Sequence, residues 1–356
     1  MNPYVMLAVA EGCGPGMVSA LLDPHLDPAR VRVDPPPLPP AAVARLHSPE
    51  LMARAEQWIE SAADHGLSTL TPADEDYPDR LRFAPLRPNL LFAKGEVGLL
   101  RSSQTTVAIV GSRSLTAYGD SASRDFGRAI AGAGIVIESG LAYGVDALSH
   151  QAALDQGTPT IAVLAGGLDR IYPPRHAELA GHIVAAGGLL LSESPPGMRA
   201  RRGHFPRRNR ILALGADAVL VVEAGLKSGS LHTARFAADF GVPVFAVPGP
   251  YTSPRSRGCH AILASGAQIA VSPDELLREL GVAEAMQHPE KDERRMESSA
   301  DEEAVLQILR GGPRPTDLVA RESGLPAEHF LAALMALREK GRVRQMPGDL
   351  LVLGDL

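Results

Sequence analysis

The sequence predicts an α/β protein with a mostly parallel sheet covered by helices on both faces, a small helical domain before it and a winged helix after it. Three observations support this fold class. Apolar strands alternate with helical stretches between residues 105 and 270, short helical segments precede them, and three helices with a hairpin follow a charged linker. A chain of 356 residues is long enough for two or three such domains.

Composition limits the classes of function. Hydrophobic residues make up 45% of the chain and charged residues 21%, which is typical of a globular protein. The formal net charge of −6 excludes a protein that is basic throughout, so a nucleic-acid site has to be a local patch. Cys13 and Cys259 lie in no metal-type spacing, and we expect a cytoplasmic protein with reduced thiols. No export signal or membrane span is expected, because the best apolar stretch, 211–222, contains Asp217 and is too short for a bilayer.

Residues 1–70 predict a small helical domain. The glycine-rich turn at 12–16 makes its first part similar to a helix-hairpin-helix, in which the glycines expose amides to phosphate, although a plain tight turn is the preferred interpretation. The proline run 35–40 predicts a stiff spacer, and the proline-containing stretch 71–100 predicts an extended lead-in to the sheet. The helices are expected at 4–10, 17–22 and 49–63.

Residues 71–283 predict the sheet domain. Its strands are short apolar runs separated by helical stretches, as in parallel sheets that are buried on both faces. Ligands of such sheets bind at the carboxyl ends of the strands. Four strands run into unusual loops, at 111–114, 139–142, 165–168 and 223–230, and we expect these loops to converge on one edge. The strands are expected at Val107–Val110, Ile135–Glu138, Thr160–Leu164, Leu189–Leu191, Ala218–Val222 and Val244–Val247.

The C-terminal part predicts a linker over 284–299 and a winged-helix domain over 300–356. The linker is polar and rich in charge. Ser299 and Glu302 have the spacing of a capping box for the first of three helices. Two apolar strands around the turn 347–349 complete the arrangement of a winged helix.

An arginine cluster at 199–210 is the strongest indication of function, because it holds six arginines and no acid in a chain of negative charge. A helix is expected to begin at Pro206. The preceding Phe205 has no oxygen to cap it, so its first amides remain available to a phosphate. A solvated basic loop is the simpler alternative. Asn209 and the ring of Phe205 favour nucleic-acid recognition, since phosphate binding and base stacking use these residue types.

Two further loops have the composition of phosphate sites. The loop Gly111–Ser114 lacks the spacing of a dinucleotide fingerprint, and Arg113 is interpreted as a phosphate ligand itself. Lys227 and Ser228 lack the glycines of a P-loop, so neither NAD nor ATP is expected as a cofactor. The turn Ser228–Ser230 can accept an anion, or it can be an ordinary turn in which Ser230 caps the next helix.

The sequence gives little support for metal binding or for hydrolysis. The histidines have no metal-ligand spacing, and no nucleophile elbow is present, so no metal and no hydrolase triad are expected. Asp146 and His150 lie four residues apart on one helix face and are interpreted as a structural pair.

Together these motifs resemble the DNA-processing protein A (DprA/Smf) family. Each motif is weak alone, but the ordered set is specific and covers residues 75–285, with the winged helix matching less closely. The motifs, in the family's order, are Ala108-Ile-Val-Gly-Ser-Arg113, Ser139-Gly-Leu-Ala-Tyr-Gly-Val-Asp146 with His150, Gly166-Gly-Leu-Asp169 with Tyr172-Pro173, Phe205-Pro-Arg-Arg-Asn-Arg-Ile211, Ser228-Gly-Ser-Leu-His-Thr-Ala234 and Val247-Pro-Gly249.

The resemblance implies an extended Rossmann-like domain that binds and protects single-stranded DNA. It also implies a homodimer that loads the recombinase RecA during natural transformation, and no catalysis. The chain departs from the family at Tyr143, where arginine is usual, at His260, where asparagine is usual, and at His232, where an apolar residue is usual. The implied DNA site comprises Gly111, Ser112, Arg113, Ser139, Gly140, Arg207, Arg208, Asn209, Arg210, Ser228, Gly229 and Ser230, to which the residue types add Phe205 and Lys227.

Two alternatives come from other classes of function. A nucleotide phosphoribohydrolase of the lysine-decarboxylase-like (LOG) type has a similar sheet, but it needs a glutamate near the glycine-rich turn. After Ser230 the sequence offers no acid until Asp239. A transcription factor could use the winged helix to read duplex DNA. Against this, residues 301–356 hold seven basic and nine acidic residues, and the third predicted helix is largely apolar, as a packing or partner-binding surface would be.

Overall fold

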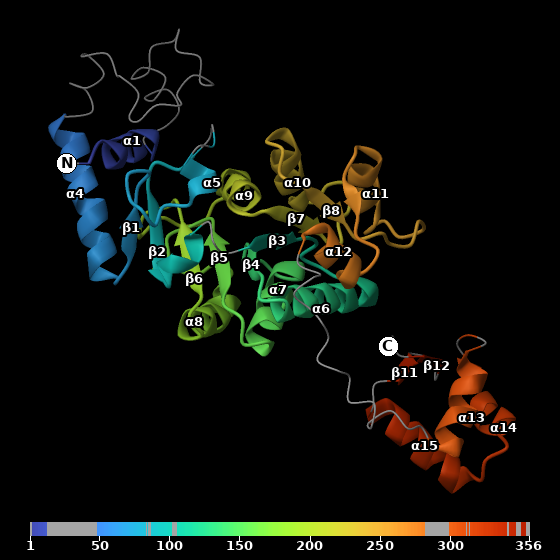
Figure 1. The fold of residues 1–356 in the computed structure, drawn as a ribbon. Helices are drawn as coiled ribbons and strands as arrows, with labels where there is room; N and C mark the ends of the chain where they lie inside the picture. Colours follow the sequence, from blue (N-terminus) through green and yellow to red (C-terminus); the bar gives the residue numbers. More distant parts are fainter. Residues whose placement is uncertain are drawn as a thin grey trace. The chain divides into compact units, whose positions relative to one another are not determined.

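The computed structural model describes residues 2–12, 48–82, 84, 87–101, 105–281, 299–310, 312, 314–339, 342–346 and 350–353. The chain divides into two compact units, Met1–Met286 and Gln287–Leu356 (Figure 1). Several predictions fall outside the described residues: most of the turn at 12–16, the helix at 17–22, the proline run 35–40, the linker as far as residue 298 and the turn at 347–349.

The described part of the first unit contains a nine-stranded sheet in the order β1-β2-β6-β5-β4-β3-β7-β8-β9. Neighbouring strands from β6 to β9 in this order run parallel, whereas β2 is antiparallel to both β6 and β1. The prediction of a mostly parallel sheet is therefore confirmed. The parallel strands are β3 (Thr106–Val110), β4 (Val136–Ser139), β5 (Thr160–Leu164), β6 (Leu189–Ser192), β7 (Ala218–Val221), β8 (Val244–Ala246) and β9 (Gln268–Ile269).

The stretch predicted as an extended lead-in belongs to the sheet. It contains β2 (Leu91–Gly95), which pairs with β6 and with β1 (Ser68–Leu70). Between them lies the short helix α5 (Asp79–Arg82), and a 3-10 turn follows β2 at Val97–Leu100. The apolar run of β2 is only three residues long, so its strand character depends on pairing with β6 more than on its own pattern.

Successive side chains of each strand point to opposite faces of the sheet and divide the core into two layers, as β3 shows. Val107 and Ile109 pack with the helices α6 (Ala117–Gly132) and α7 (Val145–Asp155). Ala108 and Val110 pack on the opposite face with α9 (His204–Gly215) and α10 (Ser230–Asp239). Because both faces are covered, the strand is a continuous apolar run. The remaining helices of this unit are α8 (Ala177–Ala185), α11 (Arg257–Ala264) and α12 (Pro273–Glu279), with a 3-10 turn at Pro174–His176.

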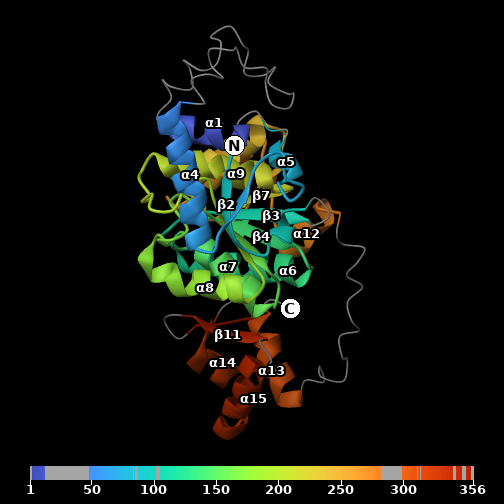
Figure 2. The same cartoon turned by 90° about the vertical axis from the view of Figure 1, so that its left-hand side faces the viewer.

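The N-terminal helices α1 (Pro3–Gly12) and α4 (Pro49–Asp64) share a core with the sheet. Trp58 of α4 lies in one cluster with Phe92 of β2, and their ring centres are 6.4 Å apart. Figure 2 shows α4 alongside β2, with α1 across its end. A separate helical domain over residues 1–70 stays a prediction, because its helices pack within the compact unit that contains the sheet.

The second unit is a winged helix, as predicted. Its described helices are α13 (Ala300–Leu309), α14 (Thr316–Glu322) and α15 (Ala327–Glu339), and its three strands follow the order β10-β12-β11. The hydroxyl of Ser299 accepts a hydrogen bond from the amide of Glu302 at 3.2 Å, which confirms the cap. The unit has its own core, built around Val305, Phe330 and Leu337. The strands are β10 (Arg314–Pro315), β11 (Val343–Met346) and β12 (Leu350–Leu353).

Candidate nucleic-acid interface

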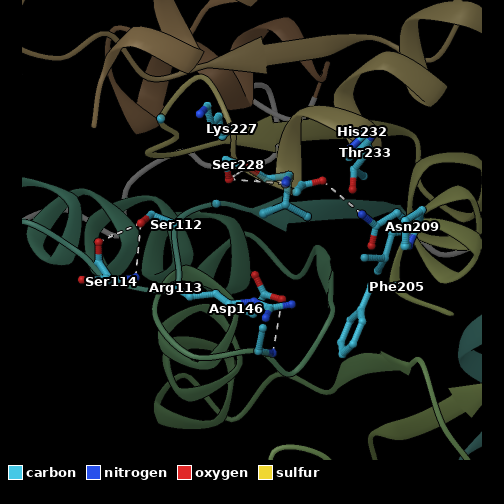
Figure 3. A pocket seen from close by; sticks show the side chains of 18 of the residues that line it. Ser112, Arg113, Ser114, Asp146, Phe205, Asn209, Lys227, Ser228, His232 and Thr233 are labelled. Atoms are coloured by element: carbon cyan, nitrogen blue, oxygen red, sulfur yellow. Dashed lines mark hydrogen bonds between the residues drawn. The ribbon is translucent and has the colours of Figure 1, made fainter. Parts of the chain in front are cut away.

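The strand order creates a crevice at the carboxyl edge of the sheet. From β3 the sheet continues through β4, β5 and β6 on one side and through β7, β8 and β9 on the other. Loops that leave β3 and β7 therefore diverge, which is where open α/β sheets bind ligands. A pocket of about 920 Å³ lies there (Figure 3), and we call it the crevice pocket. Its lining includes Gly111, Ser112, Arg113, Ser114, Asp146, Tyr172, Arg202, Phe205, Arg208, Asn209, Lys227, Ser228, Gly229, Ser230, His232, Thr233, Arg255 and Arg257.

The turn after β3 forms one wall of the crevice pocket. Gly111 has no room for a side chain, because a Cβ there would lie 2.4 Å from Val145 Cγ2. The amide of Ser112 donates to the carbonyl of Glu223 at 2.6 Å, and its hydroxyl donates to the carbonyl of Ser114 at 2.7 Å. This tight turn is bonded to the segment that follows β7 and leaves the side chain of Arg113 exposed in the pocket.

Aromatic rings lie beside Arg113. Its guanidinium carbon is 5.0 Å from the ring centre of Phe205, which makes a cation–π contact. The ring of Tyr172 meets Phe205 edge to face at 5.9 Å, and half of Tyr172 is exposed. A positive charge next to accessible ring surface is the combination that binds a phosphate and stacks the neighbouring base.

The turn after β7 lies opposite Phe205, as Figure 3 shows for Lys227 and Ser228. The hydroxyls of Ser228 and Ser230 are 2.7 Å apart, and the side-chain amide of Asn209 donates to the carbonyl of Gly229 at 3.2 Å. Helix α10 begins at Ser230 with Gly229 as its N-cap and no side-chain cap, so Ser230 is not the cap. The first amides of α10 are bonded within the turn, because those of Ser230 and Leu231 donate to the hydroxyl and the carbonyl of Ser228. The dipole of α10 still favours an anion at this end of the helix.

Helix α9 begins earlier than predicted. It starts at His204 with Gly203 as its N-cap, so Pro206 lies two residues inside the first turn. The expected absence of a side-chain cap is confirmed. The reason for the shift is that proline tolerates any position of the first turn, where its missing amide has no partner to lose.

Arg208 lies inside the protein, although it lines the floor of the crevice pocket. One of its guanidinium nitrogens donates to the carbonyl of Gly140 at 2.9 Å and to that of Val163, and its Nε donates to Asn209 Oδ1 at 3.1 Å. Burial lowers the pKa of Arg208 to about 10, while the carboxylate of Asp146 counteracts this shift. Its donors bond the loop after β4 and strand β5, so it is not the exposed first-turn arginine that the sequence suggested.

The arginine cluster has an acidic partner from another part of the chain. Glu193, which follows β6, accepts hydrogen bonds from Arg207 at 2.8 and 2.9 Å and from Arg210 at 2.6 Å. Neither arginine lines the crevice pocket. Two of the three arginines in this helix turn thus share one carboxylate within the fold, which the local sequence could not reveal.

Two more predicted residues lie below the pocket surface. Ser139 is fully buried, and its hydroxyl donates to the carbonyl of Ile109 at 2.6 Å. Gly140 lies against the guanidinium of Arg208, where a Cβ would be 2.4 Å from one nitrogen. Both shape the pocket from behind, whereas ten predicted residues line it: Gly111, Ser112, Arg113, Phe205, Arg208, Asn209, Lys227, Ser228, Gly229 and Ser230.

Asp146 is the one carboxylate among the described residues that line the crevice pocket. Its Oδ2 accepts from the amides of Gly140 at 3.2 Å and Ala142 at 3.3 Å. Burial raises the pKa of Asp146, and Arg208 opposes the rise. The expected pair with His150 is wrong, because the ring of His150 instead bonds the hydroxyl of Thr160 at 2.8 Å.

The sequence analysis missed several lining residues. Arg202 lines the pocket, although it was grouped with Arg199 and Arg201, which do not. Arg255 lies in the loop after β8 and Arg257 begins α11, and no local pattern in the sequence identifies them, because their place at the pocket depends on the strand order. In total, six arginine and lysine residues face one aspartate around the pocket: Arg113, Arg202, Arg208, Lys227, Arg255 and Arg257. The crevice pocket is thus a local basic site in a chain of negative net charge.

The described ranges hold no group of three or more residues suited to a metal, and no helix in them is long and apolar enough to span a bilayer. Comparison with known proteins identifies the relatives of this chain. Residues 68–281 match the family model described as DNA recombination-mediator protein A. The chain belongs to this family. Residues 289–349 match the model of the DprA winged-helix domain.

Members of the DprA/Smf family are similar over most of the chain. Protein Smf of Escherichia coli K12 is 38% identical over 298 residues, which cover 82% of this chain and 78% of that protein. The DNA processing protein DprA of Bacillus subtilis is 40% identical over 61% of this chain and 72% of its own. The resemblance inferred from the ordered motifs is therefore confirmed.

Solved structures of DprA proteins have the same fold. The crystal structure of DprA from Streptococcus pneumoniae superposes with a TM-score of 0.60 at 32% identity, covering 78% of this chain and 93% of that one. A DprA structure from Helicobacter pylori superposes with a TM-score of 0.53 at 32% identity, covering 60% and 95%. The latter is described as revealing a single-stranded DNA binding mode of that protein.

Proposed function

We propose that this chain binds single-stranded DNA in the crevice pocket, as a DNA-processing protein of natural transformation and recombination. The observation that carries the proposal is the contact between Arg113 and Phe205, with Tyr172 beside them, opposite the positive end of the α10 dipole. The related H. pylori protein, whose structure concerns single-stranded DNA binding, is consistent with this role.

The composition of the pocket favours single strands over duplex. Accessible aromatic faces are useful only where bases are unstacked, as in single strands. The basic residues surround one pocket and do not form the long stripe that tracks a duplex backbone. Ser139, Gly140, Arg207 and Arg210 act in this proposal by shaping the pocket, while the other predicted residues contact the strand.

A titration of labelled oligo-dT and of a duplex of equal length, followed by fluorescence anisotropy at one salt concentration, tests the proposal. We expect tighter binding to the single strand, with affinity that decreases as salt increases. Equal or tighter binding of the blunt duplex would contradict it.

We further propose that the chain loads the recombinase RecA and acts as a homodimer in the cytoplasm. The recombination-mediator family supports the first part. For the second, β9 is an edge strand on which Ile269 and the nearby Val271 are more than half exposed, as expected of a surface that pairs with another copy. Light scattering of the purified protein, and RecA filament formation on protein-coated DNA, test these two statements separately.

We infer that the chain is not an enzyme. The carboxylate of Asp146 accepts two backbone amides, and that of Glu223 accepts the amide and hydroxyl of Thr116, so both acids near the glycine-rich turns have structural partners. A phosphoribohydrolase needs a carboxylate that is free to act as a base. Release of base from a nucleoside monophosphate by the purified protein would contradict this inference.

A further inference from the structure

We propose that the loop Gly249–Arg257 is a second arm of the DNA site, in which Arg255 and Arg257 bind phosphates and Tyr251 stacks a base. This inference rests on the proposed function and extends it, because it gives the strand a path beyond the turns after β3 and β7. The arm would contact the part of the DNA strand that extends out of the crevice pocket.

The topology places this arm at the right distance. The loops after β3, β7 and β8 leave three adjacent parallel strands, and all three contribute to the lining of the pocket. Neighbouring strands are ~4.8 Å apart, so these loops cover roughly 10 Å of the sheet edge. Basic residues from all three loops can therefore contact successive phosphates: Arg113 after β3, Lys227 after β7, and Arg255 with Arg257 after β8.

Arg255 joins the arm to the turn after β3. Its Nη1 donates to Ser112 Oγ at 3.1 Å and to the carbonyl of Ser114, and its Nη2 donates to Ser114 Oγ at 3.2 Å. These bonds occupy three of the five N–H groups of an arginine. The rest of the guanidinium can reach a phosphate that lies on the same turn as Arg113.

Both ends of the arm are fixed to the body of the unit. The amide of Gly258 donates to the carbonyl of Ala224 at 2.7 Å, and a Cβ on Gly258 would lie 2.5 Å from that oxygen. At the other end, Nε2 of His260 bonds the carbonyl of Gly249 at 3.0 Å. A loop held in this way presents Arg257 with little loss of conformational entropy on binding. His260 thereby acquires a role that the departure from the family pattern did not suggest.

Tyr251 is the most exposed large hydrophobic residue in the described chain, with 86% of its surface accessible. Tyr118 also lies near this loop, but its hydroxyl donates to the carbonyl of Pro248. Leu226, from the neighbouring loop after β7, is 60% exposed. An aromatic ring in solvent on the same loop as two arginines matches the stacking platforms that bind single strands without base specificity.

The test uses the full-length protein with Arg257→Ala, Tyr251→Ala and the double variant. Arg278→Ala is the matched control, because Arg278 is an exposed helix arginine that does not line the crevice pocket. Arg255→Ala would also release the turn after β3, so Arg257 gives the cleaner result. Both targets and the control residue are exposed, and a thermal melt of each variant checks that the fold is retained.

Binding is measured with a short oligo-dT of about six nucleotides and a long one of about twenty, since single-strand sites span roughly 4–16 nucleotides. For the long strand we expect Arg257→Ala to reduce the salt slope by roughly 0.7, which is one phosphate contact. We expect Tyr251→Ala to weaken binding about fivefold or more without changing that slope. The affinity for the short oligonucleotide should decrease much less in these variants. Arg278→Ala should bind both oligonucleotides as the unaltered protein does.

Cross-linking supplies a second measurement, because a Tyr251 with only a structural role would not attach to the DNA. A long strand containing 5-iodouracil should, on irradiation, attach to the peptide that contains Tyr251. If Arg257→Ala and Tyr251→Ala bind the long strand normally while Arg113→Ala does not, the second arm is wrong and the proposed function stands. If the unaltered protein binds no single strand, the proposed function itself fails.

Discussion

Arg113 and Phe205 meet at the crevice pocket, with the guanidinium carbon 5.0 Å from the ring centre, although they are far apart in the sequence. Arg113 projects from a turn that is bonded to Glu223 after β7, and Phe205 lies in the first turn of α9. The contact orients the cation beside the ring. One residue can then bind a phosphate while the other stacks the adjoining base.

Replacing Arg113 with alanine should weaken single-strand binding by about tenfold, for a loss of ~1.4 kcal/mol, and equally for all base sequences. The reason is that a guanidinium on a phosphate reads charge and not base identity. The salt slope should decrease by roughly 0.7. Salt-titrated anisotropy on oligo-dT and on a mixed-sequence strand measures both effects.

Arg199→Ala is the control for this variant. Arg199 is exposed in the same arginine cluster as Arg202 but does not line the crevice pocket. A loss as large as that of Arg113→Ala, or a strong dependence of the Arg113→Ala loss on base sequence, would show that the phosphate contact has been placed on the wrong residue.

Phe205→Ala should produce a different signature. Loss of one stacking ring costs ~1–3 kcal/mol of binding free energy, whereas the number of phosphate contacts is unchanged. Affinity should therefore decrease while the salt slope stays constant. Phe205→Tyr, which keeps the ring, should bind nearly as well as the unaltered protein. A salt slope that changes in Phe205→Ala would argue that the ring acts only by holding Arg113.

The fold could be predicted from the sequence because its strands are apolar runs bounded by glycine turns. β5 (Thr160–Leu164) has the predicted bounds, four of the other predicted strands differ by one residue at one end, and β4 is shifted by one residue at both ends. Strand β2 was missed because its short run is defined by its partner β6. The local sequence pattern identifies a strand only where both of its faces are buried, because its residues then form a continuous apolar run.

The site could be predicted only in part, because the sequence does not show which charges are already paired. Arg207, Arg208 and Arg210 are close in the sequence, yet Arg208 bonds one carbonyl after β4 and one within β5, while the other two bond Glu193. Conversely, Arg255 enters the pocket from the loop after β8, a position that depends on strand order. Neither fact is encoded in the spacing of the cluster.

Arg208→Ala is therefore expected to destabilise the fold. Removing a buried guanidinium leaves the carboxylate of Asp146 and two carbonyls without their partner, at a cost of ~3 kcal/mol or more. Arg208→Lys should restore little, because an ammonium lacks the planar fork that bonds several acceptors at once. Denaturant unfolding measures the change. An unchanged stability with weaker DNA binding would return Arg208 to the role of a direct phosphate ligand.

Glu138 should make stability depend on pH. It is buried on β4, and burial raises its pKa from 4.5 to about 8, while the charges of Arg208 and Arg80 oppose the rise. The folded protein thus keeps a proton that the unfolded chain releases. This stabilisation is fully present below the unfolded pKa and is lost as pH increases towards about 8.

Glu138→Gln should remove this dependence, because the amide is neutral at every pH. The melting temperature of the variant should exceed that of the unaltered protein by an amount that grows between about pH 5 and pH 8 and is constant above. Thermal melts across this range measure the difference. A constant difference from about pH 5 to pH 9 would show that Glu138 is already ionised in the fold.

The winged-helix unit should be dispensable for holding DNA. Residues 301–356 contain seven basic and nine acidic residues, so their summed charge repels phosphates at distances within the Debye length. The unit has its own core around Phe330 and Leu337, and the residues that line the crevice pocket all belong to the first unit. The exposed charges of the winged helix should contribute little to the binding free energy.

A chain that ends at Gly281 should therefore bind oligo-dT with an affinity within about twofold of the full-length value. Anisotropy titrations of both proteins measure the two affinities, and circular dichroism verifies folding. A folded truncated chain that has lost most of its single-strand affinity would assign part of the DNA site to the winged helix, and the exposed apolar residues Leu331 and Met335 of α15 would then be the first to replace.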